Sequence, residues 1–215
     1  MSVLPIRRAS AANTIAAELR EALLSGRFAP GTPLVAGDLA ERVGAHPATV
    51  RAALAELERD GLVVHSLQRG LEVAPLTHDE LHDIYSARRV YERAGLEAML
   101  GRSPVDVSWL NAAIERMGEA AIAGDERALV EGDIAFHLAI VAAAGSRRLT
   151  RSAQGALMDL RLVLSVADRA SDDMPALVAD HQVLVEVFQT ASVSESLAAL
   201  DDHLVHGEQL AASAL

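Results

Sequence analysis

Apolar side chains in the first third of the chain recur every three or four residues and then gather into two short runs. Ile15, Leu19 and Leu23 fall on one face of a helix, which is an amphipathic pattern. Similar patterns, each followed by a glycine that can end a helix, predict helices at residues 11–24, about 37–43 and about 47–60. The two later runs flank a polar turn that contains glycine, and they predict a β-hairpin of residues 62–65 and 71–74.

The remainder of the chain keeps a helical pattern. Thr77 and Glu80 are spaced as in a capping box and open a helix that reaches about residue 100. Further helices are expected from Ser103 to about 123, between residues 125 and 145, from there to about 170, and over about 176–190 and 194–212. No strand-like alternation occurs in this part. The sequence thus predicts a mostly α protein, with a winged helix-turn-helix (three helices plus a β-hairpin) in residues 1–75 and an all-helical antiparallel bundle in residues 76–215.

Composition restricts the chemistry that is available. The chain has 215 residues and no cysteine, which excludes disulfides, thiolate metal sites and cysteine nucleophiles and fits a reducing cytoplasm. No apolar run approaches the length of a membrane span, and the first residues have no long apolar core after their arginines. We therefore expect a soluble, cytoplasmic protein that has no membrane partner.

Charge is divided unevenly along the chain. Residues 1–75 hold 8 arginines and 8 acids, whereas residues 76–215 hold 11 arginines and 22 acids, and the chain has no lysine. The net charge of −11 therefore belongs to the C-terminal part. A nucleic-acid site, if the chain has one, is expected in the near-neutral N-terminal part, where the third predicted helix would enter the major groove.

Four residues of the C-terminal part are candidate metal ligands. Asp133 and His137 are four apart and share one face of a predicted helix, while His181 and His203 lie on or beside apolar stripes of later helices. Three imidazoles and one carboxylate can form the first shell of a Zn²⁺-like divalent transition metal ion. On spacing alone, the later histidines could equally be residues at the edge of the core that bond backbone carbonyls.

Residues 10–75 carry motifs at many fixed positions: Pro30-Gly31-Thr32-Pro33-Leu34, Asp38-Leu39-Ala40-Glu41-Arg42-Val43-Gly44 and Val50-Arg51-Ala52-Ala53-Leu54-Ala55-Glu56-Leu57. This stretch resembles the DNA-binding domain of GntR-type bacterial transcription regulators. The resemblance implies a homodimer that binds a pseudo-palindromic double-stranded operator. The DNA contacts that it implies here are His46, Thr49, Arg51, Arg69 and Gly70.

Two departures from the family pattern and one alternative role for Arg51 qualify that assignment. His46-Pro47 stands where the family usually has a small hydroxyl residue followed by arginine, and Gly37 stands where it often has arginine. These departures affect the expected affinity for DNA. Arg51 could alternatively form a surface ion pair with Glu56 or Glu58.

The C-terminal part carries a second set of motifs: Arg88-Arg89-Val90-Tyr91-Glu92, Asp133-Ile134-Ala135-Phe136-His137, Asp180-His181 and His203-Leu204. Over residues 77–212 the chain resembles the FCD ligand-binding domain of FadR-like GntR regulators. The resemblance implies a metal held by Asp133, His137, His181 and His203. It also places Arg88 at the effector pocket, where a guanidinium suits a small carboxylate; the alternative is a surface ion pair of Arg88 with Asp83 or Glu92.

These observations favour a ligand-responsive DNA-binding transcription regulator with no catalytic residues. A metal-dependent helical hydrolase is one alternative, but no further acid has a spacing that marks it as the general base. A ligand sensor that has lost DNA binding is another. His206 is expected to be exposed, and His65, His78 and His82 are expected at the surface.

Overall fold

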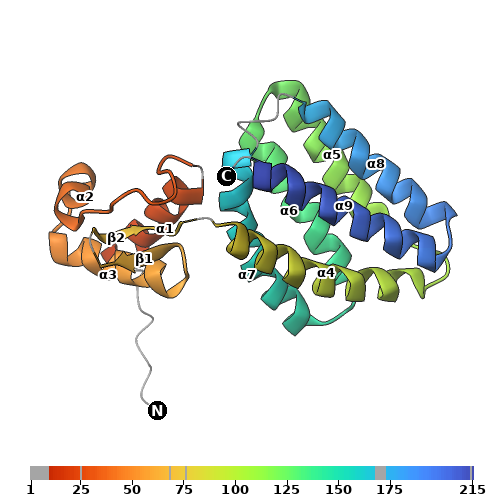
Figure 1. Ribbon diagram of the computed structural model, residues 1–215, viewed down its shortest axis with the longest axis horizontal. Helices are drawn as coiled ribbons and strands as arrows, with labels where there is room; N and C mark the ends of the chain where they lie inside the picture. The colour runs from red at the N-terminus through yellow and green to blue at the C-terminus, as the bar shows by residue number, and fades with distance from the viewer. Residues whose placement is uncertain (1–9, 25, 68, 76, 168–172, 214) are drawn as a thin grey trace, which may run out of the picture. The chain divides into compact units, whose positions relative to one another are not determined.

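The computed structural model describes residues 10–24, 26–67, 69–75, 77–167, 173–213 and 215, with side chains omitted at residues 24 and 158–167 (Figure 1). The chain divides into two compact units, residues 1–75 and residues 76–215. Gln68 of the predicted hairpin turn and the predicted end of a helix near residue 170 lie outside the described residues.

The N-terminal unit is a winged helix-turn-helix. It contains α1 (Ala11–Leu24), α2 (Ala36–Val43), α3 (Pro47–Arg59), β1 (Val63–Ser66) and β2 (Gly70–Val73). Helices α1 and α2 both pack on α3, and the two strands pair antiparallel with Val63 opposite Val73. Leu23, Leu54 and Leu57 are buried in its apolar core. The predicted layout of three helices and a hairpin is confirmed.

The C-terminal unit is a helical bundle throughout its described residues. Its helices are α4 (His78–Leu100), α5 (Ser108–Ala123), α6 (Glu126–Ala142), α7 (Arg147–Ala167), α8 (Met174–Thr190) and α9 (Val193–Ser213). The capping box at the start of α4 is present, with Thr77 and Glu80 each bonding the other's backbone. The predicted start of α5 at Ser103 is wrong, because the helix begins at Ser108, whose backbone N–H donates to Asp106.

The packing of α4 and α6 positions the candidate site. Helix α6 packs against α4, α5 and α7, while α9 lies along α4 (Figure 1). A Cβ atom added at Gly95 of α4 would lie 2.0 Å from the backbone oxygen of Ile140 in α6, so only glycine allows this approach. The two helices are therefore held nearly in backbone contact, close to the residues described next. Among the described helices, none is long and apolar enough to cross a membrane.

Candidate metal and effector site

Three histidines from three helices meet inside the bundle. His137 of α6, His181 of α8 and His203 of α9 each offer a nitrogen, and these atoms lie within 4.8 Å of one another. His137 and His181 are buried, and His203 is half-buried. The structure thus brings together the three histidines that the sequence singled out, although they are far apart along the chain.

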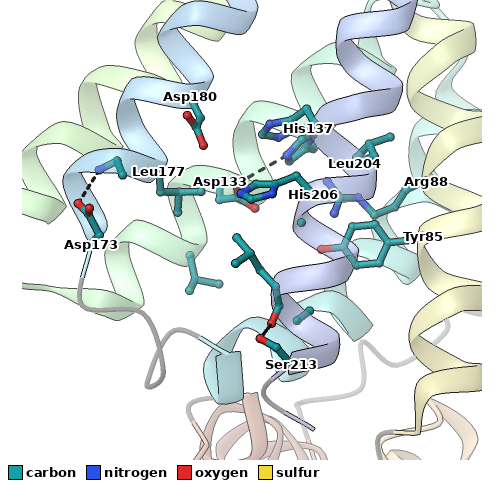
Figure 2. Close-up of a pocket in the computed structure, with 16 residues that line it drawn as sticks. Tyr85, Arg88, Asp133, His137, Asp173, Leu177, Asp180, Leu204, His206 and Ser213 are labelled. Atoms are coloured by element: carbon teal, nitrogen blue, oxygen red, sulfur yellow. Dashed lines mark hydrogen bonds and ion pairs between the residues drawn. The ribbon is translucent and has the colours of Figure 1, made fainter.

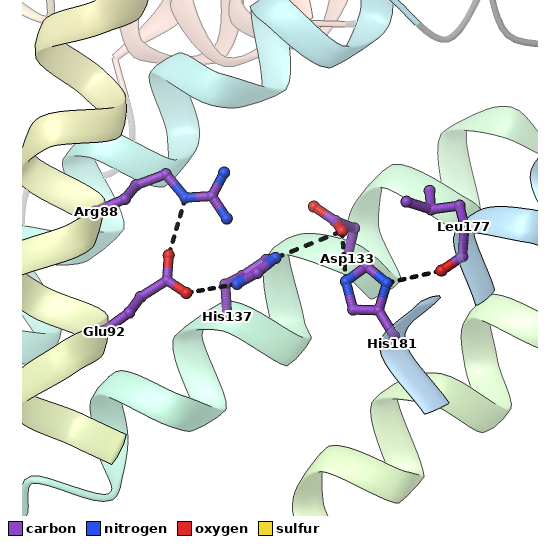
Figure 3. A network of polar contacts seen from close by, with 6 residues as sticks. All are labelled: Arg88, Glu92, Asp133, His137, Leu177 and His181. Carbon is purple, nitrogen blue, oxygen red and sulfur yellow. Dashed lines mark hydrogen bonds and ion pairs between the residues drawn. The ribbon is translucent and has the colours of Figure 1, made fainter. Parts of the chain in front are cut away.

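Asp133 lies next to this group, one helical turn before His137. Its Oδ1 atom lies 3.0 Å from Nε2 of His181 and 3.7 Å from Nε2 of His137 (Figure 3). The Asp133 side chain is also buried. Asp133 therefore lies beside two of the three clustered histidines, those of α6 and α8.

In two of the imidazoles, those of His137 and His181, the Nδ1 atom lies beside a hydrogen-bond acceptor. Nδ1 of His137 lies 2.6 Å from Oε2 of Glu92, and Nδ1 of His181 lies 2.8 Å from the backbone oxygen of Leu177 (Figure 3). A carboxylate and a carbonyl can only accept, so each Nδ1 carries the donated proton. In the neutral ring, Nε2 is then left with a lone pair directed at the shared volume.

One buried nitrogen supports a cation in that volume. Nε2 of His181 has no hydrogen-bond partner among the described residues, although Oδ1 of Asp133 is only 3.0 Å away. Buried polar atoms are nearly always paired, and each exception requires an explanation. A metal ion bound to this nitrogen would satisfy it, and the imidazole and carboxylate donors suit a transition metal.

The electrostatics keep both buried acids ionised. Burial acts to raise the pKa of Asp133, but His137 and His181 outweigh it and hold that pKa well below its ordinary value. Burial likewise acts to raise the pKa of Glu92, but His137 and Arg88 bring it below the ordinary value. Both groups therefore remain hydrogen-bond acceptors and negative charges at neutral pH.

The pKa values of His137 and His203 are shifted in opposite directions. Burial acts to lower the pKa of His137, but the negative charges of Glu92 and Asp133 raise it above its ordinary value. Burial lowers the pKa of His203, and the neighbouring His137 and His181 lower it further, to well below its ordinary value. His203 is therefore a neutral imidazole at neutral pH, which is the form that binds metals.

Arg88 lies beside this group on α4. Its Nε donates to Oε1 of Glu92 at 2.9 Å, and its guanidinium carbon is 4.7 Å from the centre of the Tyr85 ring. The Arg88 and Glu92 side chains are only 4% and 0% exposed. The expected alternative, an ion pair with Glu92, therefore exists, but it is buried instead of lying at the surface.

Glu92 is the residue that sequence reasoning missed as part of the site. It follows Arg88 by four residues, as a surface ion pair on a helix would. The available signal was the apolar stripe of α4, because Leu81, Tyr85 and Leu96 are buried on the same face. A charged pair on a buried stripe indicates a polar network inside the fold.

A pocket of about 200 Å³ opens beside the cluster (Figure 2). It is bounded by α4, α6, α8 and α9, and Asp133, His137 and His203 form part of its wall. Arg88 and Tyr85 line it from α4. His206 is exposed, as expected, and also lies at this pocket. Because pockets for drug-sized ligands are typically about 300–1,000 Å³, this one suits a smaller molecule.

The residues expected to contact DNA lie in the helix-turn-helix and the hairpin. His46 is the N-cap of α3, and its Nδ1 accepts from the backbone N–H of Ala48. Thr49 is half-buried, and Arg51, about half a helical turn later, is exposed. In the hairpin, Arg69 is exposed, with Glu72 3.7 Å away, and Gly70 has a positive φ of 76° at the start of β2.

The ion-pair alternative for Arg51 finds no support in the described part of the chain. Glu56 lies 3.8 Å from Arg20 of α1, and no ion pair joins Arg51 to Glu56 or Glu58 among the described residues. Among the described residues, no ion pair therefore holds the exposed Arg51 side chain against the protein.

The fold and the site define a class of protein: winged-helix proteins that carry a second, helical unit with an internal pocket. Residues 11–73 match the family of bacterial regulatory proteins called the gntR family, and residues 83–206 match the FCD domain. The FCD match alone covers more than half of the chain. The chain belongs to the gntR family, in the group with a C-terminal FCD domain, as its sequence motifs indicated.

Several proteins of known sequence or structure are similar to it. The HTH-type transcriptional repressor GlaR of Escherichia coli strain K12 is 33% identical over 141 residues, which are 61% of this chain and 62% of that protein. The gluconate operon transcriptional repressor of Bacillus licheniformis is 28% identical over 193 residues, covering 86% of this chain and 78% of that protein.

A crystal structure described as a transcriptional regulator GntR from Rhodococcus sp. RHA1 superposes with a TM-score of 0.81 at 27% identity. That comparison covers 96% of this chain and 99% of the other. The first curated relatives are matched over shorter stretches, with 30% and 62% of their lengths spanned by this chain.

Proposed function

We propose that this protein is a homodimeric transcription regulator that binds operator DNA through its winged helix-turn-helix and responds to a small carboxylate bound with a divalent transition metal. The observation that carries the proposal is the meeting of three histidines beside the pocket that Arg88 lines, with Asp133 next to two of them. Nε2 of His181, which has no assigned hydrogen bond and lies 3.0 Å from Oδ1 of Asp133, supports a cation there.

Asp133, His137, His181 and His203 would hold the ion. When bound, it supplies positive charge and open coordination positions next to the pocket. The imidazoles of His137 and His181 are already oriented by Glu92 and by the Leu177 carbonyl. Little rearrangement is therefore needed for these two side chains to bind.

Arg88 would bind the carboxylate of the effector. Its Nε is occupied by Glu92, so recognition falls to the two terminal nitrogens, which extend away from Glu92 in Figure 3. Two parallel N–H donors fit the two oxygens of a carboxylate. Tyr85 lies against the guanidinium and limits the positions that it can take. The pocket volume of about 200 Å³ favours a small acid, and one similar protein is named for the gluconate operon, gluconate being a carboxylate.

We assign binding and no catalysis to this site. Both oxygens of Glu92 accept hydrogen bonds, from Arg88 and from His137, so this acid is not placed to take a proton from water. Regulation requires that the effector bind the DNA-competent and DNA-incompetent states with unequal affinity. Two winged helices related by a two-fold axis would read two half-sites of an operator.

The metal part of the proposal is tested by elemental analysis of protein purified without chelators. We expect about one ion per chain in the wild type and little in His137→Ala or His203→Ala. His78→Ala is the control, because His78 is an exposed histidine at the start of α4 and does not line the pocket. Unchanged metal content in both ligand variants would contradict the site.

The effector part is tested by a thermal-shift screen of small mono- and dicarboxylates, gluconate included, with and without zinc. A ligand that binds only the native state raises the unfolding temperature by mass action. Arg88→Lys keeps the charge but loses the planar pair of donors, so the shift should shrink. A shift of full size in this variant would remove Arg88 from the effector site.

The DNA part is tested by gel shift on fragments from upstream of the protein's own gene. Arg51→Ala should weaken binding. If Arg51 contacts one phosphate, log affinity should also fall less steeply with log salt, by roughly 1 in the magnitude of the slope. Arg59→Ala is the control, since Arg59 lies at the far end of α3 and donates to the Ala55 carbonyl. Absence of any shift at low salt would favour a sensor that has lost DNA binding.

A further inference from the structure

Glu92 is a buried acid that bonds two functional side chains at once. Its carboxylate is 0% exposed, and each of its oxygens has one partner. Oε1 accepts from Nε of Arg88 at 2.9 Å, and Oε2 lies 2.6 Å from Nδ1 of His137 (Figure 3). This one side chain therefore joins the proposed carboxylate-binding residue to a proposed metal ligand.

The contact determines which nitrogen of His137 is available. An ionised carboxylate only accepts, so Nδ1 of His137 must donate to it, and Nε2 is the nitrogen left for an ion. His181 reaches the same arrangement through a backbone carbonyl, that of Leu177. No substitution can remove that carbonyl, whereas the acceptor for His137 depends on the side chain at position 92.

We propose that Glu92 is a positioning residue: it fixes the ring and the tautomer of His137 for metal binding and holds Arg88 at the same pocket. This inference rests on the proposed metal site. Outer carboxylates that accept from a metal-binding histidine orient the ring and raise its basicity as a ligand. Because Arg88 bonds the other oxygen of the same carboxylate, loss of Glu92 would disturb the metal site and the carboxylate site together.

Glu92→Gln is the informative substitution, because the amide has the shape of the carboxylate but carries two donors. Arginine has no acceptor, so the amide oxygen must face Arg88 and the amide nitrogen must face His137. Nδ1 of His137 then becomes the acceptor, and Nε2 carries the proton. A protonated Nε2 cannot bind a metal, so we expect zinc affinity to fall by about 10- to 100-fold.

Glu97→Gln is a matched control on the same helix. Glu97 accepts from Nε of Arg93 four residues earlier, as Glu92 does from Arg88, but the Arg93 and Glu97 side chains are about half exposed. This variant loses a similar i,i+4 pair without touching the histidines. Its zinc affinity should equal that of the wild type.

The experiment is a calorimetric titration of chelator-treated full-length wild type, Glu92→Gln and Glu97→Gln with Zn²⁺ alone, after circular dichroism has compared their folding. Loss of affinity confined to Glu92→Gln supports the proposal. Equal affinities in the wild type and Glu92→Gln overturn it and leave the metal site standing. Failure of the wild type to bind zinc overturns the metal site itself and the positioning role with it.

A measurement on the wild type covers the case in which Glu92→Gln does not fold. In the ¹⁵N spectrum of the zinc-loaded protein, His137 should bind zinc through Nε2 and keep a hydrogen-bonded proton on Nδ1. Zinc on Nδ1, or absence of that proton, would overturn the assignment of Glu92. A purely structural role for Glu92 would not dictate this ring signature.

Discussion

The close approach of α4 and α6 leads to a prediction about Gly95→Ala. The added Cβ would lie 2.0 Å from the Ile140 oxygen, 2.6 Å from the Ile140 carbonyl carbon and 2.7 Å from the Val141 Cα. All three are backbone atoms, so no side-chain rotation can relieve the clash. Ordinary contact begins near 3.4 Å, and the helices must therefore separate locally by about 1.4 Å.

That separation has two expected effects. Overpacking a close-packed interior costs about 1–3 kcal/mol. At roughly 2–4 °C per kcal/mol, the unfolding temperature should fall by roughly 2–12 °C. Gly95 follows Glu92 by three residues and Ile140 follows His137 by three, so the shift should also lengthen the 2.6 Å contact between those side chains. Zinc affinity should decrease as well.

The assay is thermal unfolding followed by circular dichroism, together with a zinc titration. Gly118→Ala in α5 is the control, because a Cβ there meets nothing within 4 Å. Alanine in that helix interior should stabilise the protein by about 0.5–1 kcal/mol. If Gly95→Ala unfolds at or above the wild-type temperature and binds zinc equally well, the inference that backbone contact between α4 and α6 positions the site is refuted.

Two further predictions concern metal removal and pH. Chelation should lower the unfolding temperature of the wild type and leave that of His137→Ala unchanged. Free zinc at 100 times Kd should add about 2.7 kcal/mol to the free energy of unfolding of the wild type. Burial raises the pKa of Tyr85 from 10.0 to about 12, so its folded state keeps a proton that the unfolded chain releases. The stabilisation from Tyr85 is complete below pH 10 and is lost as pH rises toward 12, a change of about 2–3 kcal/mol in the free energy of unfolding. The chain has no lysine or cysteine to titrate there, so chelator-treated Tyr85→Phe should flatten this pH dependence and Tyr91→Phe should retain it.

Local signals were enough to predict most of the fold. Amphipathic spacing and end signals located the helices, and the capping box of Thr77 and Glu80 is formed as expected. The start of α5 was misplaced because a proline such as Pro104 is favoured in a first helical turn. The chain instead bonds the Ser108 backbone to Asp106 before the helix begins, and nothing in the residue spacing distinguishes these two starts.

The candidate site was predictable where residue type alone carries the chemistry. Apolar stripes marked the histidines as side chains that require partners, but only the resemblance to the FCD domain distinguished metal ligands from residues that bond backbone carbonyls. Glu92 was missed because an acid four residues after Arg88 has the spacing of an ordinary surface pair, and only the apolar stripe of α4 indicated otherwise. Its burial depends on how closely α6 approaches α4 at Gly95, and such an approach between helices distant in sequence has no local signature.

The three histidines are 44 and 22 residues apart in a chain that has no cysteine. This chain therefore cannot form a disulfide. In the proposed function, an ion bound to all three histidines would cross-link α6, α8 and α9 instead and close two loops of the chain. Unlike a disulfide, this link would be reversible and set by metal supply. Amide hydrogen exchange in α8 and α9 should consequently slow as zinc is added, so the rigidity of this half of the bundle would report the availability of the ion.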